Sequence, residues 1–156
     1  MIRKLRSLTI QDWTNIVTIL GIIIAVISLI ISVYTFRQQK EIDSAQLMLD
    51  FNKDLSSEKN SEITAAIENN APLFRKNKGS FTSTDIDNYL GIYELINNVH
   101  EAHLITDDML YNAFSYDFIK TYQNKEIADY LNEARKDDPL IFVGSEGLAK
   151  NLELIK

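Results

Sequence analysis

The chain has 156 residues, of which 46% are hydrophobic and 24% charged, and its 22 acidic and 16 basic side chains give a formal net charge of −6. These averages are those of a soluble acidic domain. Because the chain has no cysteine, a disulfide framework, a thiolate metal site and a cysteine nucleophile are excluded. Duplex DNA is a poor partner for such a chain, since phosphate contacts need a basic surface.

One segment departs from these averages. Trp13 to Phe36 are 24 consecutive uncharged residues, which reach roughly 36 Å as a helix and exceed a hydrocarbon core of about 30 Å. Aromatic residues stand near both ends, where the headgroups lie. We interpret the segment as a retained transmembrane helix rather than a signal peptide, because no small-residue cleavage site follows it before Arg37.

The charges divide around this span. Residues 1–12 form a basic tail of net +2, whereas residues 37–156 carry 13 basic and 21 acidic side chains, net −8. The positive charges near the span give only a slight preference for a cytoplasmic N-terminus.

The small residues of the span follow one heptad-like seam, with successive spacings of 4, 3, 4, 3, 4 and 3. Small side chains let transmembrane helices approach closely, and a 3.5-residue period favours left-handed packing. We therefore predict that the spans self-associate. One alternative is that the seam lines a narrow polar path, and another is that Thr and Ser are simply tolerated in lipid. The seam consists of Thr14, Thr18, Gly21, Ala25, Ser28, Ser32 and Thr35.

Beyond the span, helical patterning predicts a stalk over residues 37–56 and then a helical domain over 57–156. The stalk's stripe is Ile42, Ala45, Leu49 and Asn52. The domain's predicted helices cover 61–69, 84–104 capped by Thr84, a segment capped by Thr106, 125–136, and a last helix capped by Ser145. Residues 140–143 resemble a strand but are too short for a sheet. The predicted fold is all-α: one transmembrane helix continuing into a stalk, then a small helical bundle.

Enzyme signatures are missing, including a glycine-rich phosphate loop, a nucleophile elbow and a metalloprotease helix. The feature most similar to an enzyme motif is the pair His100 and His103, which are three residues apart. Glu94 or Asp107 would complete a metal site with this pair. Such pairs are more often surface residues. We predict no enzyme activity, catalytic residue, metal or cofactor.

A basic island interrupts the acidic domain between Asn69 and Thr84, 16 residues without an acid. It combines cations, a glycine that permits close backbone approach, hydroxyls and a helix N-terminus, which together suit an anion. A solvated loop and a loop that touches lipid headgroups are alternatives. The predicted phosphate contacts are Arg75, Lys76, Lys78, Ser80 and Thr82.

On the helix that follows, Tyr89, Tyr93, Asn97 and His100 share one face by their spacings of 4, 4 and 3. Aromatic rings beside amides suit stacking on nucleobases and reading of their edges. We predict that Tyr93, Asn97 and His100 meet bases. The alternative is that the tyrosines are core residues.

The layout resembles small bacterial defence proteins, and more narrowly the membrane-associated ancillary effectors of type III CRISPR systems that bind a cyclic oligoadenylate. The resemblance rests on the span from Ile16 to Tyr34, on Arg75-Lys76-Asn77-Lys78, and on Tyr-Leu-Gly-Ile-Tyr-Glu-Leu-Ile-Asn-Asn-Val-His from Tyr89 to His100.

The resemblance implies an antiviral homo-oligomer, tetramer-like, in the bacterial inner membrane, with a cytoplasmic C-terminal domain. It further implies that this domain takes up cyclic tetra-adenylate and that the spans then perturb the membrane. A membrane anchor that binds a protein partner through its acidic helices is the alternative of another class, and a nuclease using His100 and His103 is a third.

Overall fold

The computed structural model describes residues 10–154, without the side chain of residue 12. This part of the chain is all-α and contains no strand, as predicted; its only β-type pairing is an isolated bridge between Phe74 and Phe81. Residues 140–142, which resemble a strand in sequence, form a turn. The elements are α1 (Ile10–Leu55), α2 (Glu58–Glu68), η1 (Arg75–Asn77), α3 (Ser83–Glu101), α4 (Asp107–Gln123), α5 (Lys125–Ala134) and α6 (Val143–Leu154).

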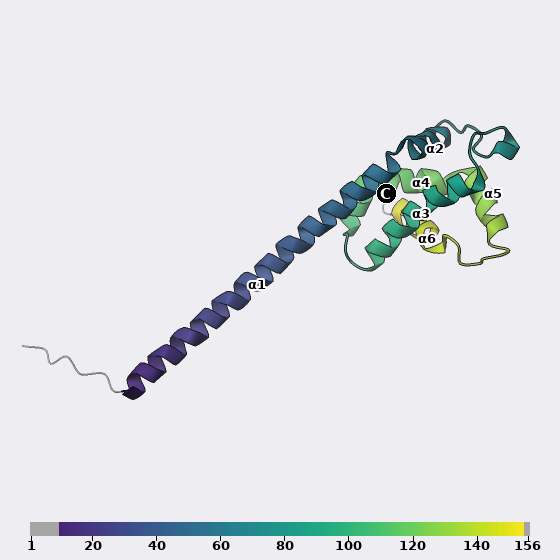
Figure 1. Cartoon of the computed structure of the whole chain (residues 1–156). Coiled ribbons are helices and arrows are strands. Elements are labelled where there is room, and N and C mark those ends of the chain that lie inside the picture. Colours follow the sequence, from purple (N-terminus) through teal and green to yellow (C-terminus); the bar gives the residue numbers. More distant parts are fainter. Residues whose placement is uncertain (1–9, 155–156) are drawn as a thin grey trace, which may run out of the picture. The chain divides into compact units, whose positions relative to one another are not determined.

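The N-terminal unit extends to Ile42 and consists of most of α1, the long helix coloured from purple to blue in Figure 1. Among the described residues, α1 alone is long and apolar enough to span a membrane. The predicted tail lies outside the described residues except for 10–12, which already belong to α1.

The side chains of the seam are exposed along α1. Several of its hydroxyls donate to the carbonyl four residues earlier in the same helix, at 3.0 Å from Thr14, 2.9 Å from Thr18, 2.8 Å from Ser32 and 2.9 Å from Thr35. These bonds satisfy the hydroxyls of a single helix in an apolar medium. These four hydroxyls therefore need no polar partner from outside the helix.

The second unit, the helical domain, begins at Asp43, which differs from the predicted start at residue 57. The last part of α1 is packed into the domain: the Ser44 hydroxyl donates to the Leu104 carbonyl, and the Phe51 ring meets Phe114 edge-on at 6.4 Å. What the sequence presented as a stalk after residue 42 is therefore a helix of the domain.

The buried face of this part of α1 is also not the predicted one. Ile42, Ala45, Leu49 and Asn52 are exposed. The face that packs instead contains Ser44, Leu47, Met48, Phe51 and Leu55. Both sets have helical spacing, and the set with the aromatic ring is the one that the domain covers.

Aromatic residues of α3 and α4 form the centre of the domain core. Tyr89, Tyr93, Phe114 and Phe118 are fully buried, and the Tyr93 and Phe118 rings meet edge-on at 4.6 Å. Helix α6 packs against both α3 and α4 (Figure 1). Ile86, Leu90 and Ile96 of α3, and Leu110 of α4, are buried in the same core.

Helix caps fix where the helices begin. Thr106 caps α4 as predicted and accepts from Met109 N at 3.3 Å. The cap of α3 is Thr82 rather than Thr84, because Thr82 and Asp85 form a reciprocal capping box. Ser145 does not cap the last helix; it lies inside α6, which begins at Val143.

The new domain boundary gives a test on two neighbouring positions of α1. Phe51→Ala is expected to lower the free energy of unfolding by about 3–5 kcal/mol, because it leaves a cavity in the core. Leu49→Ala, on the exposed face, is expected to change it by no more than about 0.5 kcal/mol. Thermal unfolding of the full chain in detergent, followed by circular dichroism, compares the two. Equal effects would contradict the packing of α1 into the domain.

Candidate functional site

The basic loop, residues 73–81, connects α2 to α3 and contains η1. Two backbone bonds close its base, from Phe81 N to Leu73 O at 2.9 Å and from Arg75 N to Phe81 O at 3.1 Å. Inside the loop, Asn77 N and Gly79 N both donate to Phe74 O, at 2.8 and 2.9 Å. The Phe74 and Phe81 side chains are buried. The loop is thus a closed turn anchored in the core at both ends.

Gly79 has a different role from the predicted one. A Cβ at this position would lie 2.3 Å from the backbone carbon and oxygen of Leu73, closer than any real contact. The glycine is therefore required because the loop folds back on its own backbone. The predicted role was to let a ligand approach the backbone closely. In the structure, the missing side chain of Gly79 instead lets the backbone of Leu73 lie close.

The three predicted cations of the loop all point to solvent. Arg75, Lys76 and Lys78 are exposed, and none of them forms an ion pair with another residue of the described chain. Arg75 Nε donates to the Ser80 carbonyl at 3.4 Å, and Lys76 Nζ lies 5.3 Å from the centre of the Phe74 ring. Their charges are therefore available to an anion from outside, and Ser80 is exposed beside them.

The inner side of the same loop already binds an anion. Glu126 Oε2, from α5, accepts from Leu73 N and from Phe74 N, both at 3.2 Å. Burial alone would raise the pKa of Glu126, but bonds from the Asn77 side chain and from these two N–H groups, with Lys76 nearby, outweigh it and lower the pKa. Glu126 is not among the predicted site residues, because nothing local in the sequence connects it to a loop some 50 residues earlier.

The structure corrects the predicted phosphate contacts at one residue, Thr82. Its hydroxyl donates to Asp85 Oδ2 at 2.7 Å and accepts from Asp85 N at 3.2 Å. Bonds from Lys59 and from Thr82 hold the pKa of Asp85 well below its usual range. Thr82 is therefore occupied by helix capping, next to a carboxylate that repels phosphate.

The structure also corrects the predicted base-reading face of α3, because Tyr93 and Asn97 lie in the core. Tyr93 is 0% and Asn97 7% exposed. The Tyr93 hydroxyl is bonded to the Tyr89 hydroxyl at 2.9 Å, which in turn is bonded to Thr64 at 3.0 Å. Burial, followed by the interaction with Tyr89, raises the pKa of Tyr93 well above its ordinary value. The alternative, that the tyrosines are core residues, is the correct one.

His100 lies at the end of this face and is partly exposed. Its Nε2 is 2.6 Å from Asp107 Oδ1, while its Nδ1 is buried without a hydrogen-bond partner. His103 ends the helix in a left-handed conformation, with φ of 56°. Within the described residues, no group of three His, Cys, Asp or Glu side chains is placed to hold a metal ion.

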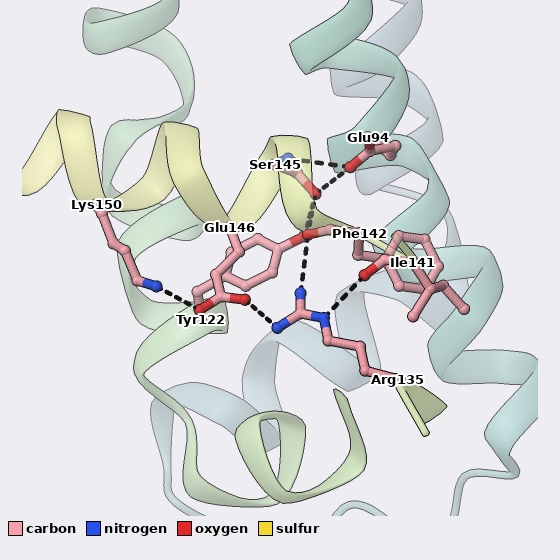
Figure 2. A network of polar contacts seen from close by, with 8 residues as sticks. All are labelled: Glu94, Tyr122, Arg135, Ile141, Phe142, Ser145, Glu146 and Lys150. Atoms are coloured by element: carbon pink, nitrogen blue, oxygen red, sulfur yellow. Dashed lines mark hydrogen bonds and ion pairs between the residues drawn. The ribbon is translucent and has the colours of Figure 1, made fainter. Parts of the chain in front are cut away.

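A polar network at the start of α6 is the other dense cluster of functional groups (Figure 2). The Ser145 hydroxyl donates to Glu94 at 2.6 Å and is 2.5 Å from the Tyr122 hydroxyl. Arg135 pairs with Glu146 at 2.5 Å and donates to the Ile141 carbonyl at 3.1 Å. Ser145 is 0% exposed, so no substrate reaches its hydroxyl. The network fastens α6 and the preceding turn to α3 and α4.

Residues 22–152 match the family described as domain of unknown function (DUF4760). The chain belongs to this family. The matched region covers most of α1 and the whole helical core of the domain. Among curated proteins and among solved structures, no match to this DUF4760 chain was found.

The bond between Glu126 and the loop predicts a pH dependence. A lowered pKa means that the folded state favours the carboxylate. The stability that Glu126 adds is therefore complete above the unfolded value of about 4.3 and is lost as the pH falls through the lower folded value. Thermal midpoints of the wild type and of Glu126→Gln, measured from pH 7 to pH 3, are expected to converge on acidification. A constant difference across this range would contradict the assignment.

Proposed function

We propose that this DUF4760 chain is a single-span membrane protein whose helical domain binds a phosphate-bearing ligand at the basic loop and does not transform it. The observation that carries the proposal is the outward presentation of Arg75, Lys76 and Lys78. Three cations without ion-pair partners within the described chain, held on a closed turn in an acidic domain, are a local site for an anion.

The ligand that the resemblance suggests is a cyclic oligoadenylate, with cyclic tetra-adenylate the first candidate. Its phosphates suit the loop. Its bases would need contacts other than Tyr93 and Asn97, which are buried. The exposed cations of the loop therefore support the proposed phosphate contacts, whereas only His100 is left of the three predicted base contacts.

A binding role without catalysis is favoured by the accessibility of the polar groups. The Ser145 hydroxyl, which is bonded to Glu94 and Tyr122, is fully buried. Two carboxylates with a lowered pKa lie near the loop cation Lys76, and both are engaged: Glu126 is bonded to the backbone of the loop, and Glu133 pairs with Lys136. We propose that the protein is an effector and not an enzyme.

The proposed response is membrane perturbation by an oligomer, with the tetramer favoured, in the bacterial inner membrane. The seam gives the spans a surface for close packing, and a ligand that binds one arrangement of subunits better than another would shift the spans. The basic loop is proposed to face the cytoplasm, where a nucleotide messenger of antiviral defence is made.

Calorimetric titration of the full chain in detergent with cyclic tetra-adenylate tests the proposal. The wild type is expected to bind at micromolar ligand, and Arg75→Ala to weaken binding by about 1.5–3 kcal/mol, the value of a hydrogen bond to a charged group. Lys53→Ala, which removes an exposed lysine of α1, is the matched control and should leave the affinity unchanged. Absence of binding by the folded wild type would reject this ligand and favour the protein-partner anchor.

Self-association is tested separately. Gly21→Leu together with Ala25→Leu fills the seam with bulk and is expected to lower the oligomer size in detergent, since close helix approach requires small side chains. Ile23→Leu with Ile27→Leu has the same spacing off the seam and serves as the control. Size-exclusion chromatography with light scattering measures the mass. An unchanged mass in the Gly21/Ala25 variant would remove the seam from the interface.

A further inference from the structure

We infer that Glu126 occupies the backbone anion site of the basic loop, so that a ligand is held by the side-chain cations alone and must offer several phosphates to bind well. The inference rests on the proposed function, and it adds which ligands the loop distinguishes and which residue sets that selectivity. It concerns a residue that belongs to α5 and not to the loop.

Backbone N–H groups in a turn are strong phosphate donors, because they are fixed in direction and lose little freedom on binding. In this loop the two converging donors are Leu73 N and Phe74 N, and a single oxygen of Glu126 accepts from both at 3.2 Å. The position in which a phosphate oxygen would sit is therefore taken by a carboxylate oxygen of the same chain.

Glu126 is held firmly in this position. It is the second residue of α5, and the capping residue Asn124 accepts from Glu126 N at 2.9 Å and from Ile127 N at 3.2 Å. Ile127, the next residue, is 0% exposed. The backbone from which the Glu126 side chain extends is thus fixed, and an incoming anion must displace the carboxylate from both N–H donors.

The cations that remain are exposed side chains on flexible stems. An exposed ion pair contributes little by itself, because side-chain entropy and solvent screening offset the attraction. One phosphate on one lysine is therefore weakly bound, whereas several phosphates can engage Arg75, Lys76 and Lys78 together. The negative charge of Glu126, close to Lys76, further disfavours a ligand with few contacts.

Two substitutions of Glu126 separate its two effects. Glu126→Ala removes the charge and frees both N–H donors. Glu126→Gln removes the charge only, since one carbonyl oxygen can accept both bonds as Oε2 does now. The probes are inorganic phosphate and tripolyphosphate, titrated into the full chain in detergent. A triple variant, Arg75→Ala with Lys76→Ala and Lys78→Ala, measures binding that does not depend on the loop cations, and this background is subtracted.

The wild type is expected to bind tripolyphosphate at least about tenfold more tightly than phosphate. Glu126→Ala should tighten phosphate binding about tenfold and reduce this ratio, as expected for two added charge-assisted bonds. Glu126→Gln should tighten both probes about two- to threefold and keep the ratio, as expected for loss of one screened charge.

The outcomes separate this inference from the proposed function. If the wild type binds tripolyphosphate and Glu126→Ala binds phosphate no better than the wild type does, Glu126 only holds the loop and the inference fails. If only the Glu126 variants bind, the inference holds and the proposed function fails for the natural chain. If neither the wild type nor any variant binds, both are overturned. Should Glu126→Ala unfold, an unchanged affinity in Glu126→Gln would overturn the inference.

Discussion

The contact on which the basic loop depends is the bond between one carboxylate oxygen of Glu126 and the N–H groups of Leu73 and Phe74. It ties the turn after α2 to the first turn of α5, so that two segments distant in sequence share one polar centre. Gly79 and the buried rings of Phe74 and Phe81 complete the closure. With the inner donors used in this way, the charged side chains of the loop are left to face solvent.

Features with a local cause could be predicted from the sequence. The uncharged span, the helices that follow residue 57 and the cap at Thr106 follow from composition, helical periodicity and short-range hydrogen bonding, and the structure confirms them. The cap of α3 lies two residues before the predicted one because Thr82 and Thr84 are both suitable caps, and each has an acid three residues later. In the structure Asp85 returns the bond to Thr82, whereas Asp87 accepts from Tyr130.

Features that depend on which face turns inward could not be predicted. Helical spacing places Tyr93 and Asn97 on one side of α3, but the same spacing describes a binding face and a core face. The rings of Phe118 and Tyr89 around Tyr93 decide for the core. Helical spacing was equally ambiguous for α1, where Leu49 is exposed and Phe51 is buried. Glu126 could not be predicted, because its partners are the Asn77 side chain and two backbone N–H groups of a loop that is distant in sequence, and the residue pattern does not record such contacts.

The acidic residues of the domain also affect the charge of the basic loop. Residues 37–156 have net charge −8, and one of these acids, Glu126 of α5, is bonded to the backbone of the acid-free stretch 69–84. A loop whose positive charge is partly cancelled from within binds a single anion weakly. Repetition of the loop in an oligomer changes this, because the second contact of a multiply charged ligand is then made at high effective concentration. The proposed phosphate site on the loop and the predicted self-association of the span are therefore compatible with one arrangement, in which assembled subunits would hold a ligand with several phosphates better than an isolated chain.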